Sequence, residues 1–292
     1  MRVGWIGVGA MGYPMALNLL QKGFELTVYG RRPESARALE RQGAKVASGW
    51  PEVIRGMDAV ILMLPDSAAV EQVLLKEQGT DLLVPGQILI DMGTSLPAST
   101  VKLAEIIQAK GARMLDAPVS GGVKGAAAGT LAIMVGGAAE AFETCLPLFR
   151  ALGKEVSHIG GNGAGHTMKL INNLISLTNL AVLAEVVPLA VKAGLKPEAV
   201  LATCAAGSAD SWALRNHLPK VINRDFSPGF KLALAVKDLT LGLELAAVRD
   251  MELNLAEMAA IYYRQGMAAG MAEENNSCIF KLLEERYGVE VK

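Results

Sequence analysis

The sequence predicts an α/β domain with a mostly parallel sheet, followed by an all-helical domain that begins with a long helix. In the first half of the 292 residues, short apolar runs alternate with helix-like segments, a pattern typical of strand-helix-strand units. From about Gly163 the strand signal stops, and glycine is frequent around that point. We therefore expect a first domain of residues 1–162 and a second of residues 163–292.

The spacing of apolar residues predicts the bounds of the individual strands and helices. The expected strands are Val3–Ile6, Leu26–Tyr29, Ala44–Ala47, Ala59–Met63, Ile88–Asp91, Arg113–Leu115, Leu131–Val135 and Glu155–His158. The expected helices between them are Met11–Lys22, Pro33–Gln42, Ser67–Lys76, Pro97–Ala109 and Ala138–Leu152. The second half is expected to form helices over Gly165–Ala193, Pro197–Ala206, Ser211–Asn223, Lys231–Met251, Leu255–Ala272 and Ile279–Tyr287.

The composition excludes two classes of protein. The chain has 28 Lys and Arg against 29 Asp and Glu, a net charge of −1, and so lacks the basic field of a nucleic-acid binder. Hydrophobic residues make up 51% of the chain, which allows a large core and excludes global disorder. We expect a folded protein with no nucleic-acid partner.

The cysteines and histidines are too few and too scattered for a disulfide scaffold or a metal site. The three cysteines form no Cys-x-x-Cys pair, and the three histidines do not cluster. Such cysteine usage is typical of the reducing cytoplasm. The apolar run after Lys169 reaches Glu185 before the roughly 18 residues that a membrane helix needs. We therefore expect a soluble, cytoplasmic protein with no bound metal and no membrane partner.

A glycine-rich turn lies between the first strand and the first helix, with the sequence GVGAMG over residues 7–12. In this context Gly7 allows the tight turn, Gly9 lets the backbone approach a pyrophosphate, and Gly12 lets the helix pack closely on the strand. Ala10 and Met11 complete the turn, whose N–H groups and helix dipole favour an anion. The sequence therefore predicts a Rossmann-type dinucleotide-binding domain.

The end of the second strand indicates which dinucleotide is bound. An NAD enzyme carries an Asp or Glu there for the ribose hydroxyls, but this sequence has Gly30 followed by Arg31 and Arg32. Guanidinium groups suit a 2′-phosphate. NADP is therefore favoured over NAD, although Glu34 could still face a ribose and the two arginines could simply be solvated.

A polar stripe interrupts the apolar pattern of the long helix. Lys169, Asn172, Asn173 and Ser176 lie at positions i, i+3, i+4 and i+7, which share one helix face. Burying such groups costs several kcal/mol unless they are paired. They either cap backbone groups at the domain junction or form a polar site that faces a cleft.

Several motifs occur in order along essentially the whole chain. They are GVGAMG, LMLP (Leu62–Pro65), DMGTS (Asp91–Ser95), DAPVSGG (Asp116–Gly122), GTLAIMVGG (Gly129–Gly137), GAGHTMKLINN (Gly163–Asn173) and VKDL (Val236–Leu239). Together they resemble the β-hydroxyacid dehydrogenase family, which includes 3-hydroxyisobutyrate dehydrogenases, tartronate semialdehyde reductases and glyoxylate/succinic semialdehyde reductases.

The resemblance implies a role for each matching position. Lys169 would be the catalytic general acid and base, and the substrate would be bound by Ser120, Gly121, Gly122 and Asn173. The nicotinamide side would be lined by Met63, Leu64, Pro65 and Thr94, with Lys237 closing over the cofactor from the helical domain. The segment Gly30-Arg31-Arg32 departs from the Asn-Arg-Thr or Asn-Arg-Ser of NADP-type members. The resemblance therefore implies the fold more firmly than it implies NADP over NAD.

These features together predict an NADP-dependent oxidoreductase that reduces a small semialdehyde acid to its hydroxyacid. The alternatives are an imine reductase-like enzyme, against which Lys169 argues, and a non-catalytic NADP-binding regulatory module. The Ala- and Leu-rich helical domain leaves more apolar surface than a domain of its size normally hides, which indicates either an oligomer or simply a well-packed bundle. The family resemblance implies a homodimer or homotetramer built through that domain.

Overall fold

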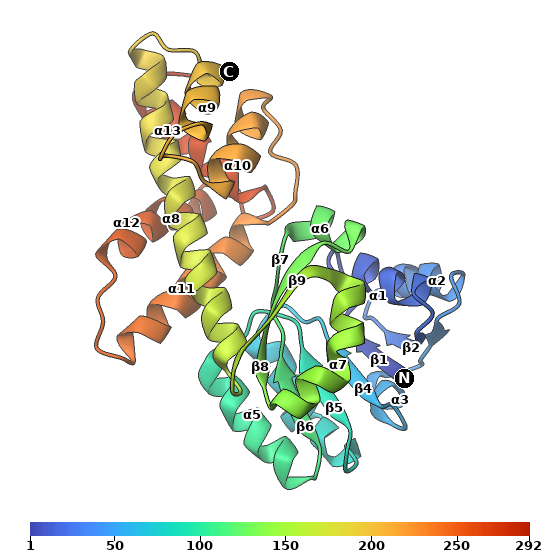
Figure 1. Cartoon of the computed structure of the whole chain (residues 1–292). Coiled ribbons are helices and arrows are strands. Elements are labelled where there is room, and N and C mark those ends of the chain that lie inside the picture. The colour runs from blue at the N-terminus through green and yellow to red at the C-terminus, as the bar shows by residue number, and fades with distance from the viewer. The chain divides into compact units, whose positions relative to one another are not determined.

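The computed structural model describes all 292 residues, which divide into two compact units, Met1–Lys169 and Leu170–Lys292 (Figure 1). The first is an α/β unit and the second is entirely helical, so the predicted fold class is confirmed. Each unit has its own hydrophobic core.

A nine-stranded sheet forms the centre of the first unit, in the order β3-β2-β1-β4-β5-β6-β8-β7, with β9 also paired to β8. Strands β1 to β6 pair in parallel, whereas β8 is antiparallel to β6 and β7 and parallel to β9. The bounds are β1 Arg2–Ile6, β2 Glu25–Tyr29, β3 Lys45–Val46, β4 Ala59–Leu62, β5 Ile88–Asp91, β6 Arg113–Asp116, β7 Val119–Ser120, β8 Leu131–Gly137 and β9 Gly153–Gly160.

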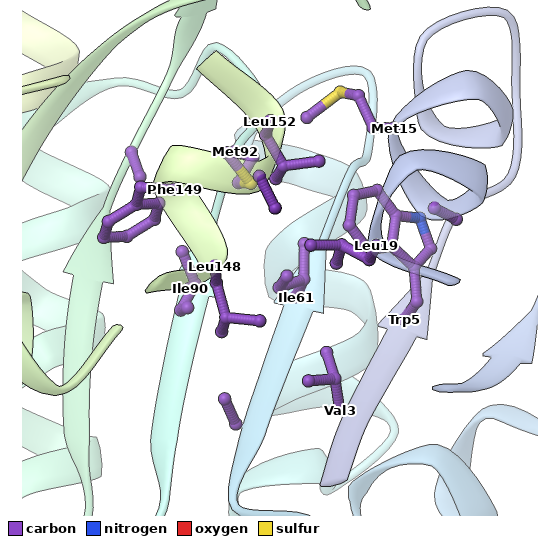
Figure 2. Close-up of a cluster of buried hydrophobic side chains, with 14 of the residues drawn as sticks. Val3, Trp5, Met15, Leu19, Ile61, Ile90, Met92, Leu148, Phe149 and Leu152 are labelled. Atoms are coloured by element: carbon purple, nitrogen blue, oxygen red, sulfur yellow. The ribbon is translucent and has the colours of Figure 1, made fainter. Parts of the chain in front are cut away.

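Helices cover both faces of this sheet, because successive strand residues point to opposite sides and both sides are apolar. On one face Trp5 and Ile61 pack against α1 and α7, as Figure 2 shows. On the other face Ile6 and Leu62 pack against α3 and α5. The helices of this unit are α1 Gly12–Gln21, α2 Pro33–Glu40, α3 Trp50–Ile54, α4 Ser67–Glu71 with a π-helical turn Gln72–Lys76 and a 3₁₀ turn Gly79–Leu82, α5 Pro97–Ala109, α6 Gly122–Ala128 and α7 Ala139–Leu152.

The second unit is built around the long helix α8, which begins at Ala164 in the first unit and ends at Lys192. By length and composition alone α8 could cross a membrane, but Leu177, Leu180 and Ala184 lie in the core of the helical unit. The other helices are α9 Pro197–Ala205, α10 Trp212–Ile222, α11 Leu232–Ala247, α12 Asn254–Ala268, a 3₁₀ turn Asn276–Cys278 and α13 Ile279–Tyr287.

Five elements have no counterpart among those expected from the sequence, namely α3, α6, the two-residue strand β7 and the 3₁₀ turns Gly79–Leu82 and Asn276–Cys278. Each is too short to show a periodic pattern. The helix expected over Lys231–Met251 also ends earlier, at Ala247, where the chain turns through Asp250 with a positive φ of 54°.

Candidate functional site

The glycine turn after β1 has the local geometry of a dinucleotide-binding loop. Gly7 has a φ of 104°, and a Cβ atom there would collide with the carbonyl oxygen of Met63. A Cβ atom on Gly12 would collide with the carbonyl oxygen of Gly7, so this helix start packs directly on the turn. By contrast, a Cβ atom on Gly9 would meet nothing within 4 Å. The one glycine that must approach a cofactor is therefore the one that faces open space, and the residues fit a bound pyrophosphate.

The start of α1 adds to this fit. Met11 is the N-cap residue, and no side chain caps the helix. The N–H of Tyr13 donates to the carbonyl of Gly9 at 2.9 Å, and the uncapped helix start suits an anion. The second expected cofactor segment follows β2. Arg31 and Arg32 are both exposed, and neither guanidinium has a hydrogen-bond or ion-pair partner in the chain.

The loops after β4 and β5 lie against each other. The N–H of Met63 donates to the carbonyl of Ile6 at 2.8 Å, which starts the Met63-Leu64-Pro65 segment beside the glycine turn. A Cβ atom on Gly93 would lie 2.5 Å from the carbonyl oxygen of Leu64, so glycine permits the close approach that places Thr94 next to this segment.

The proposed carboxylate loop, Ser120 to Gly122, joins β7 to α6. Gly121 and Gly122 have φ values of 132° and 61°, a backbone course that residues with a Cβ atom rarely follow. A Cβ atom on Gly122 would meet nothing within 4 Å. The loop therefore exposes backbone on the side where Gly122 lies.

Lys169 lies on the first turns of α8 and is only 9% exposed. The start of this helix is held by Asp116, whose carboxylate accepts the N–H groups of Gly163 at 2.8 Å and His166 at 2.9 Å. Burial raises the pKa of Asp116, while His166 and these backbone hydrogen bonds oppose that shift.

In the helical unit Asn173 and Lys237 meet at one residue that the sequence analysis did not single out, Asp238. The amide of Asn173 donates to Oδ2 of Asp238 at 2.5 Å, and Nζ of Lys237 lies 3.0 Å from Oδ1. Asp238 is 2% exposed. The sequence feature that could have identified Asp238 is its position in the VKDL motif, one residue after Lys237.

The predicted residues therefore fall into two groups. In the first unit, the glycine turn and the segments containing Met63, Thr94 and Ser120 each follow the carboxyl end of a strand, the edge where open α/β sheets bind ligands. Asn173 and Lys237 form a separate cluster around Asp238 in the helical unit.

Comparisons with known proteins agree with this geometry. A family model described as the NAD binding domain of 6-phosphogluconate dehydrogenase matches residues 2–160. A second, described as the NAD-binding domain of NADP-dependent 3-hydroxyisobutyrate dehydrogenase, matches residues 163–283. This chain belongs to the β-hydroxyacid dehydrogenase family.

Individual members of the β-hydroxyacid dehydrogenase family match over nearly their whole length. The chain is 38% identical to 2-hydroxy-3-oxopropionate reductase from Escherichia coli, over 97% of each chain. It is 37% identical to 2-(hydroxymethyl)glutarate dehydrogenase from Eubacterium barkeri, over 99% of this chain and 97% of that one. The solved structure of Mycobacterium tuberculosis 3-hydroxyisobutyrate dehydrogenase with L-serine has a TM-score of 0.89 and 31% identity, covering 97% of this chain and 98% of that one. The protein is thus an oxidoreductase with a nicotinamide cofactor, as predicted.

Proposed function

We propose that this enzyme uses NADPH to reduce a small aldehyde that carries a carboxylate, and that it oxidises the hydroxyacid in the reverse direction. The observation that carries the proposal is Lys169, an ammonium side chain that is only 9% exposed on a helix whose first turn is held by Asp116. A largely buried lysine ammonium in a dinucleotide-binding oxidoreductase is a candidate for general acid–base chemistry.

Lys169 acts as the general acid of the reduction. A bound NADPH supplies the hydride that the aldehyde carbon accepts. The aldehyde oxygen becomes negative at that moment, and the Lys169 ammonium stabilises the charge and donates a proton from Nζ to the oxygen. In the oxidation, neutral Nζ accepts the proton of the substrate hydroxyl. Relatives named as a reductase and as dehydrogenases fit either direction.

The substrate carboxylate binds at Ser120, Gly121 and Gly122, with Asn173 as a further donor. The Ser120 hydroxyl and the backbone N–H groups of the two glycines are hydrogen-bond donors that suit a carboxylate. The positive φ values of Gly121 and Gly122 support this assignment, because they give the loop a backbone course that side chains would disfavour.

The cofactor is held by the glycine turn of residues 7–12, with Met63, Leu64, Pro65 and Thr94 beside the nicotinamide and Lys237 as a further cationic contact. The exposed pair Arg31 and Arg32 binds the 2′-phosphate, which supports NADPH over NADH. The second family model, whose description names an NADP-dependent enzyme, supports the same choice.

A panel of initial rates tests the proposed reaction. Tartronate semialdehyde, methylmalonate semialdehyde, glyoxylate and succinic semialdehyde are each offered with NADPH and with NADH, and propionaldehyde serves as the aldehyde that lacks a carboxylate. We expect kcat/KM to be highest for one of the four acids with NADPH. Equal rates for propionaldehyde, or a preference for NADH, would contradict the substrate class or the cofactor respectively.

We also propose that a second copy of this chain covers the apolar face of α8. Its exposed apolar residues recur at intervals of three, four or seven along the helix, which places them on one face. They are Met168, Ile171, Ile175, Val182, Val186 and Leu189. Light scattering should report a dimer or tetramer, and Ile175→Glu should shift it toward monomer. A monomeric unmodified chain would contradict this proposal.

The cysteines support a reducing compartment, and we propose the cytoplasm. All three are free thiols in the structure. Burial raises the pKa of both Cys145 and Cys278 to about 12, so these two thiols stay protonated and unreactive.

A further inference from the structure

Two buried carboxylates lie side by side at the ends of neighbouring strands. Asp91 ends β5 and Asp116 ends β6, and the two residues are partners in the parallel register. Both are 0% exposed. The Asp91 carboxylate accepts the N–H of Gly93 at 2.9 Å and the hydroxyl of Ser95 at 2.7 Å. Asp91 therefore shapes the turn that carries Thr94, just as Asp116 holds the start of α8.

The His166 side chain lies between these two carboxylates. Its Nδ1 atom is 2.7 Å from the hydroxyl of Thr100 on α5 and 3.9 Å from Oδ2 of Asp116. Its Nε2 atom is 3.7 Å from Oδ2 of Asp91 and has no hydrogen-bond partner. The imidazole is 0% exposed, so water does not take the place of a partner at its surface.

Electrostatics favours a proton on Nε2 of His166. An unprotonated Nε2 would direct a lone pair toward the Asp91 carboxylate, whereas an N–H there is attracted to it. Two buried carboxylates also need compensation, since burial alone disfavours their charge. An N–H at Nε2 supplies this compensation to Asp91, and the backbone N–H groups of Gly163 and His166 supply it to Asp116.

The helix start that carries His166 has no room to shift. A Cβ atom on Gly165 would collide with the carbonyl oxygens of Asp116 and Met134. A Cβ atom on Gly136 would lie 2.7 Å from both the Asp116 carboxylate and the Gly165 nitrogen. The first turn of α8 is thus packed directly on the ends of β6 and β8.

We propose that His166 is a positioning residue for Lys169, which follows it by three residues on α8. Through Asp91 and Thr100 the imidazole links this helix turn to the Thr94 loop and to α5, and through Asp116 to the strand that leads into the Ser120 loop. The Lys169 ammonium is thereby held at a fixed place relative to both loops. This inference rests on the proposed role of Lys169 as the general acid.

Replacing the His166 imidazole measures how much it contributes to kcat. We expect His166→Leu to lower kcat about 10-fold to 100-fold, since a displacement of about 1 Å can cost 100-fold. The Kd for NADPH and the KM for the aldehyde should change less than threefold. His166→Gln, which keeps a side-chain amide toward Thr100, should recover most of kcat. His158→Leu is the control, because it removes an exposed imidazole of the same unit whose hydrogen bond is to the Gly137 carbonyl and whose ring stacks on Phe142.

A second variant keeps the proposal testable if His166→Leu does not fold. Thr100→Val is nearly isosteric and removes only the hydroxyl that meets Nδ1. We expect it to lower kcat about threefold to tenfold with unchanged cofactor binding. Unchanged kcat in a folded His166→Leu would overturn the proposal. If His166→Leu does not fold, unchanged kcat in Thr100→Val would overturn it.

A double-mutant cycle with Lys169→Ala separates positioning of Lys169 from other effects. If His166 acts through Lys169, His166→Leu should lower kcat in the unmodified enzyme and have little effect once Lys169 is alanine. An equal loss in both backgrounds would overturn the positioning role while leaving Lys169 as the acid. A near-normal kcat in Lys169→Ala alone would instead overturn the proposed function, and this inference with it.

Discussion

Val8 occupies the space into which a side chain at residue 30 would have to extend. A Cβ atom built on Gly30 would collide with Cγ2 of Val8, a buried side chain with a stiff χ1 angle. The φ of Gly30 is not positive, so its backbone conformation does not itself require glycine. The lack of an acid after β2 is therefore coupled to the second residue of the glycine turn.

This relationship predicts how cofactor preference can be changed. Gly30→Asp alone should lower the melting temperature by several degrees and fail to support NADH, because the new side chain meets Val8. Adding Val8→Ala should restore stability and raise the NADH to NADPH ratio of kcat/KM at least tenfold, since the acid can then bind ribose hydroxyls. Val8→Ala alone is the control. A stable, NADH-preferring Gly30→Asp variant would show that Val8 imposes no limit.

The arginine pair should account for NADPH preference. Arg31→Ala combined with Arg32→Ala should raise the NADPH KM about tenfold or more per arginine, from charge-assisted bonds of about 1.5–3 kcal/mol each. The NADH KM should stay nearly constant. Arg55→Ala removes another exposed arginine of the same unit and should change neither value. An unaltered preference in the double variant would rule out these two side chains as the phosphate site.

The carboxylate loop should discriminate between substrates. Ser120→Ala should raise the KM for the best aldehyde acid about tenfold, because it removes one hydrogen bond to a charged group. The KM for propionaldehyde should change less than threefold. Ser157→Ala, on an exposed position of β9, is the matched control. Equal losses for both aldehydes would indicate general damage to the loop instead.

Lys169 should be required for the chemical step. Lys169→Ala should lower kcat about 10²-fold to 10⁴-fold, the usual range for a general acid or base, with NADPH affinity retained. Lys169→Arg should recover little, since a guanidinium keeps its proton and has a different shape. Steady-state kcat measured beside NADPH fluorescence titration separates chemistry from binding. Lys192→Ala, exposed at the end of the same helix, should behave as the unmodified enzyme.

The buried imidazole of His217 should make the folded protein less stable in mild acid. Burial, assisted by the charge of Lys220, lowers its pKa to about 4 despite a hydrogen bond to the side chain of Asn275. The unfolded chain binds a proton near pH 6.5 and the folded chain does not, so stability is complete above pH 6.5 and falls as the pH drops toward 4. The loss should reach about 3 kcal/mol. Urea unfolding at pH 7.5, 6, 5 and 4 measures this loss, and His217→Gln should flatten the dependence of stability on pH; parallel slopes in both proteins would contradict the assignment.

The order of the large strands and helices follows from the sequence, because the apolar periodicity that predicts each of them is local. Alternating apolar runs predicted the parallel strands, and the absence of such runs after Gly163 predicted the helical unit. The glycine turn was equally readable, since each of its three glycines has a separate backbone role at fixed spacing. Short elements such as β7 and α6 were missed, because two to seven residues are too few for a period to show.

The pairing of side chains that lie far apart in the sequence depends on the packing of the whole chain and could not be predicted from local patterns. His166, Asp91 and Asp116 lie 25 to 75 residues apart, and nothing local in their segments marks them as partners. The register of β5 with β6 brings the two carboxylates together, and the start of α8 inserts the imidazole between them. The same holds for Val8 and Gly30. A Cβ atom on Gly30 would collide with Val8 because the parallel pairing of β1 with β2 places the two turns side by side. Periodicity reports which face of an element is buried, whereas the identity of the neighbour across that face depends on strand order and register, which are set by packing of the whole chain.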